Sequence, residues 1–137
     1  MNATEYLEQV KKIDILIENN RHERQRWFAR ANSIGPSYSE ETPSHGTSDP
    51  HKLSNAIATY SDIDREIAEL ELKREAIIHT IGRLPSDECS VIYKLYVQYK
   101  DYPTIKDVAY DKHMSYDWVK KRKSNALRLL QEILDKD

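Results

Sequence analysis

The sequence lacks the patterns of a disulfide-bonded, secreted or membrane-spanning protein. Cys89 is the only cysteine, so no disulfide can form within the chain, and this usage fits a reducing compartment. No apolar run approaches the roughly 20 residues needed to cross a bilayer. The N-terminus also has no basic segment followed by an apolar one. We therefore expect a soluble, cytoplasmic protein.

Patterns for catalysis and metal binding are missing as well. There is no Gly-rich phosphate loop and no Ser, His and Asp set with a fold to hold it. Cys89 lies on the apolar face of a predicted helix, which favours a core role over that of a nucleophile. None of the histidines shares a metal-ligand spacing with Cys89; they are His22, His45, His51, His79 and His113. We expect no enzymatic activity, no metal and no cofactor.

Glycine and apolar residues are too few for a large spherical core. The 137 residues include 3 Gly, 39% are hydrophobic and 32% are charged. Such a composition suits long, thin helices whose charged faces stay in water. We predict an all-α fold with a helical hairpin over residues 1–84 and a three-helix domain over residues 85–137.

The hairpin is predicted from two apolar stripes at helical spacing. The first helix should cover about 3–31, with Asn2 as its N-cap and Glu5 at the third position of its first turn. The second should cover about 50–82, with Asp49 as N-cap and Pro50 in the first turn. The stripe residues are Ala3, Tyr6, Leu7, Val10, Ile13, Leu16, Ile17, Trp27, Phe28 and Ala31, then Leu53, Ile57, Tyr60, Ile63, Ile67, Leu70, Ile77, Ile78 and Ile81.

A mobile loop over 32–49 should join these two helices, because it is rich in Gly, Pro and Ser. The second stripe has a heptad pattern, interrupted only at Arg74. Neither helix is stable alone in water. The simplest arrangement is an antiparallel coiled coil within one chain, but the same stripes could pair with a second copy of the protein. The sequence leaves both open.

The C-terminal domain is predicted to contain three shorter helices. The first covers 86–99 and the second covers 104–111, with Thr104 as N-cap and Asp107 three residues on. The third begins after Ser115 as N-cap and runs to about Leu134. The apolar face of the first holds Cys89, Ile92, Leu95, Tyr96 and Tyr99, and that of the third holds Val119, Ala126, Leu127, Leu130, Ile133 and Leu134.

The last two helices have the spacing of a helix-turn-helix. This motif needs a small residue where its helices cross and an aliphatic residue about ten positions later. Ala109 and Val119 supply that pair. His113 falls where the turn requires a left-handed backbone, which His tolerates better than most non-glycine residues.

These residues resemble a known family. Leu84-Pro85 before an apolar helix, then T-I-K-D-V-A from Thr104 and M-S-Y-D-W-V-K from Met114, look like the DNA-binding fourth region of bacterial sigma factors. The S-Y-x-x-V segment from Ser115, behind a paired-helix N-terminus with Y-L-E-Q-V from Tyr6, is similar to sigma-like and ArpU/RinA-type late transcription regulators of Gram-positive phages and mobile elements. The resemblance implies a bacterial host cell, promoter DNA as ligand and contact with host RNA polymerase.

Three residues depart from the family pattern. Lys112 replaces a buried apolar residue ahead of the turn, His113 replaces Gly or Asn, and Arg122 replaces a residue that is usually Leu in the phage subset. Tyr110 is a candidate to cover part of the gap that these changes leave.

The resemblance also implies which residues meet DNA. The exposed positions at the start of the last helix should face the major groove: Tyr116, Asp117, Lys120, Lys121 and Ser124. Lys123 and Arg128 favour phosphates, and Thr104 with its following amides forms an anion site for one more phosphate. We include Ser115 and Trp118 in the predicted site. A lone helix-turn-helix makes few contacts, so we expect a homodimer or a complex with polymerase.

Other interpretations remain open for the same residues. The lysines from Lys120 to Lys123 could be a solvated helix face, Asp117 could complement its own helix N-terminus, and Trp118 could pack on the neighbouring helix. The whole chain could instead be a protein–protein adaptor, with a coiled-coil arm that binds a partner and a structural C-terminal bundle.

The charge distribution bears on this choice. Residues 1–84 have 11 Lys and Arg against 14 Asp and Glu, whereas residues 85–137 have 10 against 9. Residues 118–128 contain five cations and no acid. A local field matters more to DNA than the total charge of −2 does. The charges therefore allow a DNA-binding function and place it in the second half.

Overall fold

The computed structural model describes residues 1–34 and 50–137, and every element in this part of the chain is helical. The protein is therefore all-α, as predicted. The elements, in chain order, are α1 (Ala3–Ile34), α2 (Pro50–Ile81), α3 (Ser86–Ile92), the π-helical segment η2 (Tyr93–Val97), α4 (Ile105–Lys112) and α5 (Tyr116–Lys136).

The chain folds into two compact units that divide the long helices between them. The terminal unit consists of Met1–Asp14 and Leu72–Asp137, so it holds the start of α1, the end of α2 and all the shorter elements. The middle unit is Ile15–Glu71. Both long helices therefore contribute to both units.

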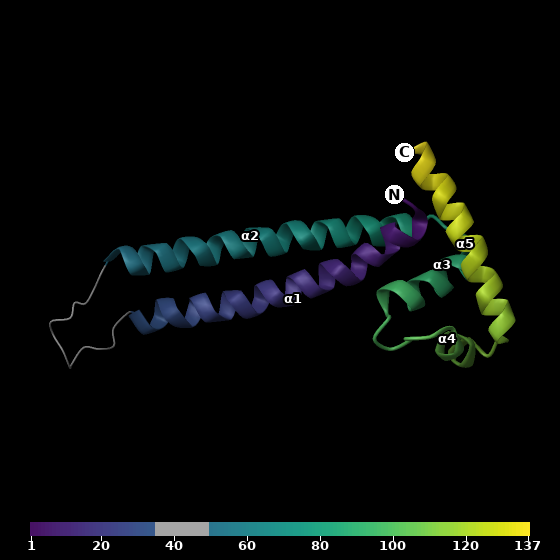
Figure 1. Ribbon diagram of the computed structural model, residues 1–137, viewed down its shortest axis with the longest axis horizontal. Coiled ribbons are helices and arrows are strands. Elements are labelled where there is room, and N and C mark those ends of the chain that lie inside the picture. The colour runs from purple at the N-terminus through teal and green to yellow at the C-terminus, as the bar shows by residue number, and fades with distance from the viewer. Residues whose placement is uncertain (35–49) are drawn as a thin grey trace. The chain divides into compact units, whose positions relative to one another are not determined.

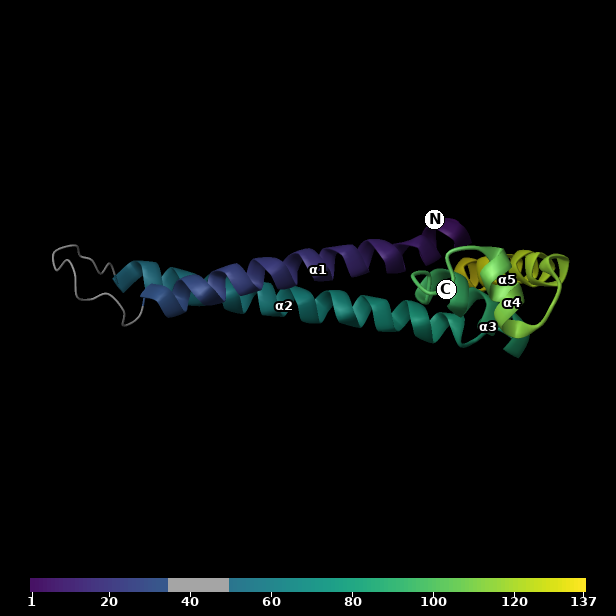
Figure 2. The same cartoon turned by 90° about the horizontal axis from the view of Figure 1, so that it is seen from below.

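In the middle unit, α1 and α2 run side by side in opposite directions (Figures 1 and 2). Arg21 lies 3.4 Å from Glu71, and Arg24 forms an ion pair with Asp64. Residue numbers rise along one helix as they fall along the other, which defines an antiparallel pair. These exposed ion pairs add little stability. The main contribution comes from apolar side chains buried on the facing stripes, which include Ile17, Ile63 and Leu70.

Three predicted stripe residues of the middle unit are only half-buried. Leu16, Phe28 and Ile57 are 48%, 51% and 52% exposed. The prediction that they belong to the buried stripe is wrong for Leu16 and Ile57, because two paired helices cover only a narrow face of each other. Phe28 still contacts the ring of Tyr60, with centroids 5.7 Å apart.

In the terminal unit, the start of α1 is capped and packed as predicted. The Asn2 side chain accepts a hydrogen bond from the Glu5 amide at 2.8 Å. Leu7 and Val10 are fully buried, together with Ile81 at the end of α2. The amide of Ala3 donates to the Gln131 side chain of α5 at 2.8 Å, which joins the first helix to the last.

The end of α1 differs from the prediction, whereas the start of α2 does not. α1 continues to Ile34, beyond the predicted end at residue 31, so residues 32–34 are helical where a loop was expected. α2 begins at Pro50 as predicted. The rest of the predicted loop and the proposed cap Asp49 lie outside the described residues, as do the side chains of Leu53 and His51.

The predicted helix over 86–99 is interrupted. It is an α-helix as far as Ile92 and then widens into the π-helical turns of η2. A π-helical turn adds a residue and shifts the face that points inward. Of the predicted face residues, Ile92 is buried, whereas Cys89, Leu95, Tyr96 and Tyr99 are only half-buried. The other buried residues of this stretch are Glu88, Val91 and Val97.

α4 and α5 begin with the predicted caps. Thr104 and Asp107 form a reciprocal capping box, in which each side chain accepts the backbone amide of the other residue. The Ser115 hydroxyl accepts the Trp118 amide at 3.0 Å. Each cap satisfies an amide that has no partner within its helix, so both helix starts are determined locally.

Candidate functional site

A small apolar core holds α3, α4 and α5 together. Val91, Val108 and Val119 are fully buried, and Ala109 is 8% exposed. Ala109 and Val119, the two residues expected at the helix crossing, therefore lie in one buried cluster. A small side chain on α4 allows α5 to approach closely. This core sets the orientation of the α5 start.

The turn between α4 and α5 depends on His113. Its φ is 57° and its ψ is 38°, the left-handed conformation that the sequence predicted. In this conformation the amides of His113 and Met114 donate to carbonyls at the end of α4, which closes the helix. The chain then reverses and reaches the Ser115 cap.

One side of α5 is exposed to solvent along its first three turns. It carries five of the predicted DNA-binding residues, Tyr116, Asp117, Lys120, Lys121 and Ser124. Their spacing alternates between one and three residues, which keeps them on one side of a helix. Within the described residues, no side chain forms an ion pair with Lys120 or Lys121. We name these five residues the α5 face.

Trp118 points the other way. Its side chain is half-buried and packs against the core of Val91, Val108 and Val119. Arg122 lies 5.8 Å from its ring centroid. Of the two roles considered for Trp118, this placement favours packing on the neighbouring helices.

The remaining predicted cations already have neighbours. Lys123 lies 5.9 Å from the centroid of the Tyr96 ring. Arg128 pairs with Glu132 at 3.0 Å and donates to the Asn125 side chain at 2.7 Å. Their charges are therefore partly balanced within the protein.

Thr104 is also occupied by an internal contact. Both its amide and its hydroxyl donate to an Asp107 carboxylate oxygen, at 3.0 Å and 2.7 Å. A carboxylate already fills the electropositive start of α4. This arrangement reduces the attraction of that helix end for a further phosphate.

The charged pair Glu88–Arg122 was not anticipated from the sequence. Glu88 is 4% exposed, and its Oε1 lies 2.9 Å from Nη1 of Arg122. Arg122 stands where the family pattern has an apolar residue, and α3 supplies the acid that compensates its charge. Its Nε is buried without a hydrogen-bond partner among the described residues. A cation three residues after the buried Val119 is the sequence signal that could have prompted a search for this acid.

Lys112 is accommodated in a similar way. Its ammonium donates to the Ser90 hydroxyl of α3 at 2.8 Å. The aliphatic stem can then lie against the protein while the charge keeps a polar partner. Tyr110 does not cover the gap, since it is 87% exposed, and that expectation is wrong.

Lys94 anchors α4 and the preceding turn to η2. Its ammonium lies 2.9 Å from Asp111 of α4 and 4.5 Å from the ring centroid of Tyr102. The hydrogen bond with Asp111 raises the pKa of Lys94 and lowers the pKa of Asp111. This ion pair connects α4 to η2 and involves no residue of the α5 face.

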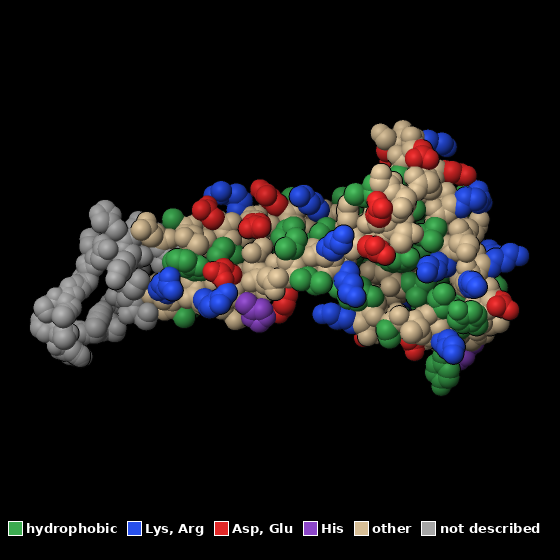
Figure 3. Space-filling view, in the orientation of Figure 1, with side chains coloured by type: hydrophobic (Ala, Val, Ile, Leu, Met, Phe, Trp, Pro, Cys, Tyr) green, Lys and Arg blue, Asp and Glu red, His purple; other side chains and the backbone are tan. Residues whose placement is uncertain are grey.

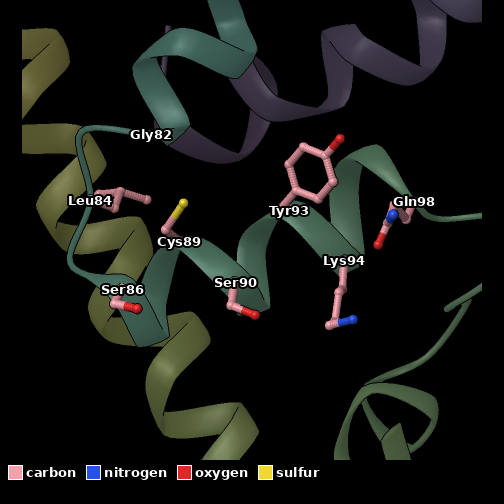
Figure 4. Close-up of a pocket in the computed structure, with 8 residues that line it drawn as sticks. All are labelled: Gly82, Leu84, Ser86, Cys89, Ser90, Tyr93, Lys94 and Gln98. Atoms are coloured by element: carbon pink, nitrogen blue, oxygen red, sulfur yellow. The ribbon is translucent and has the colours of Figure 1, made fainter. Parts of the chain in front are cut away.

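A shallow hollow of about 520 Å³ lies alongside α3 and η2. Figure 4 shows that Cys89 and Tyr93 point to one side of the helical segment that carries them, and Ser90 and Lys94 to the other side. The lining residues are Gly82, Leu84, Ser86, Cys89, Ser90, Tyr93, Lys94 and Gln98. Its one cation, Lys94, is paired with Asp111, so the hollow offers no free charge to a ligand.

Comparison of the chain with protein-family models, with curated proteins and with solved structures gives no match. Within residues 1–34 and 50–137, no helix is both long and apolar enough to cross a membrane. In the same ranges, no three His, Cys, Asp or Glu side chains gather into a set that could hold a metal ion.

Proposed function

We propose that this protein is a sequence-specific DNA-binding transcription regulator that inserts the start of α5 into the major groove of promoter DNA. The observation that carries the proposal is the α5 face, which follows a left-handed turn and a capped helix start. The resemblance to phage sigma-like and late-gene regulators supports the same function.

The shape of α5 suits this role. An α-helix fits the major groove, and residues near its N-terminus then meet the base edges. Tyr116, Asp117 and Lys120 lie within the first five positions of α5. The buried side of the helix is held by the core and by the Glu88–Arg122 pair. One side of α5 is thus packed against the rest of the domain, and the opposite side is available to contact DNA.

The lysines of the α5 face supply the electrostatic attraction. Lys120 and Lys121 are exposed and have no ion-pair partner among the described residues. Each can hold a phosphate or donate to guanine O6 and N7. Lys123 and Arg128 would have to leave Tyr96 and Glu132 to do the same.

One such module reads few base pairs, so specificity needs a second DNA-binding unit. A homodimer would provide two half-sites, and a complex with host RNA polymerase would provide other DNA contacts. Both arrangements belong to the proposal. In either arrangement, the long helices α1 and α2 would bind the partner that supplies the second DNA-binding module.

The test is binding to duplex DNA across a salt series. Phosphate contacts release counterions, so the logarithm of the binding constant should fall steeply with the logarithm of salt concentration. We expect the Lys120→Ala/Lys121→Ala variant to reduce this slope by about 1–2 units. The control Lys73→Ala/Lys136→Ala removes the same charge from exposed lysines outside the α5 face and should leave the slope nearly unchanged.

The opposite result is equally clear. If the wild type and the Lys120→Ala/Lys121→Ala variant bind duplex DNA equally weakly at low salt, the α5 face is not a DNA-binding surface. The adaptor function would then be the better hypothesis. It is supported by the half-exposed side chains of Ile15, Leu16, Phe28 and Ile57 on the middle unit, which offer apolar area to a protein partner.

A further inference from the structure

Apolar side chains are unusually exposed around the turn between α4 and α5. Tyr110 is 87% exposed, Met114 is 46% exposed and Tyr116 is 44% exposed. The three lie within seven consecutive residues, at the end of α4, in the turn and at the first position of α5. We name them the turn patch.

The turn patch contributes little to the fold. The core of this region is made by Val91, Val108, Ala109 and Val119, with Trp118 packed against it. The side-chain hydroxyls of Tyr110 and Tyr116 form no hydrogen bond within the described residues. Folding therefore does not explain three large apolar side chains in water.

Charge surrounds these side chains. Figure 3 shows hydrophobic side chains gathered over α4 and the start of α5, with Lys, Arg and His side chains among them. Lys120 and Lys121 follow Tyr116 by about one turn of α5. The turn patch lies beside two lysines without ion-pair partners. A complementary binding partner would therefore present apolar groups surrounded by negative charges. A purely apolar protein partner would leave these ammonium groups without water or an anion.

The major groove of DNA is such a surface. Phosphates line its edges, and the one apolar group on its floor is the C5 methyl of thymine. Cytosine, adenine and guanine present only donors and acceptors there. Tyr116 is at the position of α5 that would reach the groove first, and Met114 lies two residues before it in the turn.

We propose that the turn patch reads thymine, through apolar contact of Tyr116 and Met114 with thymine methyl groups in the major groove. This inference rests on the proposed function and adds to it the base that is recognised. Burial of one methyl group is worth about a fourfold change in affinity. Two thymines in contact would give a change of roughly tenfold or more.

The experiment removes the methyl group from the DNA and leaves the protein intact. A duplex is first selected from a random-sequence pool by the full-length protein. Each thymine of that duplex is then replaced by uracil, which keeps its base pair and lacks only the C5 methyl. We expect about fourfold weaker binding at one or two adjacent positions and no change at the others.

A protein variant links that effect to the turn patch. Tyr116→Ser should weaken binding to the thymine duplex, and it should no longer distinguish thymine from uracil at one of the sensitive positions. Leu72→Ser is the matched control, because Leu72 is 70% exposed on α2 and lies outside the turn patch. It should keep the full discrimination of the wild type.

The outcomes separate the two proposals. If the protein selects a duplex and binds it with a steep salt dependence, but uracil is tolerated at every position, thymine reading is overturned and DNA binding stands. Discrimination by Tyr116→Ser that equals that of the wild type at every sensitive position also overturns it. If no duplex is selected at any salt concentration, both proposals fail.

Discussion

At the scale of single residues, a charged pair between α3 and α5 accompanies the apolar core that packs these helices. Arg122 and Glu88 form a pair whose side chains are 29% and 5% exposed. A buried pair of this kind stabilises less than its short distance suggests, because both groups lose water. Removal of only one of the two side chains destabilises the protein strongly, because the remaining buried charge then has no partner.

We expect Glu88→Ala to lower the free energy of unfolding by about 3 kcal/mol, near the low end for buried pairs because Arg122 keeps some contact with water. The double variant Glu88→Leu/Arg122→Leu should recover most of that loss. Urea denaturation of the three proteins measures both effects. Equal stability of Glu88→Ala and wild type would show that the pair is not buried in solution.

His113 is a second decisive residue, because it adopts the left-handed conformation without being glycine. We expect His113→Gly to raise the free energy of unfolding by about 0.5–1 kcal/mol, after the greater freedom of glycine in the unfolded chain is subtracted. His113→Val should lower it by about 1–2 kcal/mol, since β-branched residues are disfavoured at positive φ. The same urea experiment checks both. A stable valine variant would mean that the turn has another conformation.

At the scale of the elements, a polar cluster joins α1, α2 and the segment that follows η2. The Tyr99 hydroxyl donates to Asp14 of α1 at 2.9 Å, and Arg74 of α2 donates to the other Asp14 oxygen at 2.6 Å. Lys11 lies 5.5 Å from the centroid of the Tyr99 ring. Three segments distant in sequence are therefore connected through one carboxylate.

Stability at high pH tests this cluster. Burial, together with the hydrogen bond to Asp14, raises the pKa of Tyr99 from 10.0 to about 12. Since the folded pKa lies above the unfolded value, the stabilisation is complete below pH 10 and is lost as the pH rises from 10 to 12. We expect Tyr99→Phe to be less stable at neutral pH and to lose stability less steeply over this range.

Thermal unfolding monitored at a series of pH values provides the measurement. Tyr110→Phe serves as the control, because Tyr110 is 87% exposed and should leave the pH dependence unchanged. An identical pH dependence for Tyr99→Phe and the wild type would contradict the proposed role of the cluster.

Local signals account for the elements that were predicted well. Asn2, Thr104 and Ser115 each cap the helix that follows them, and a cap involves residues only three positions apart. The π-helical turns of η2 were missed because they have no comparable local signal. Their effect on which side chains point inward depends on packing between helices.

At the scale of the whole molecule, charge is distributed unevenly. The total is −2, but the five cations between residues 118 and 128 stand without an acid in that segment. Three of the five have neighbours that moderate their charge, namely Glu88, Tyr96 and Glu132. Of these five cations, only Lys120 and Lys121 have no ion-pair partner and no cation–π contact among the described residues. The salt-dependence experiment therefore targets these two lysines.

The boundary between units also belongs to this scale. A division near residue 84 was expected where the helix pattern changes, whereas the compact units divide α1 and α2 internally. The start of α1 and the end of α2 pack in the terminal unit because Leu7, Val10 and Ile81 are fully buried there. A change of helix pattern marks where elements end and says little about which elements pack together.

The sequence by itself determined the all-α class, the capped starts of α1, α4 and α5, and the left-handed turn at His113. These features depend on backbone hydrogen bonding and periodicity over a few residues. Only the tertiary structure decided which acid compensates Arg122, which way Trp118 points and which lysines remain free. Those outcomes depend on residues that lie on different helices, and their contacts exist only once the helices have packed.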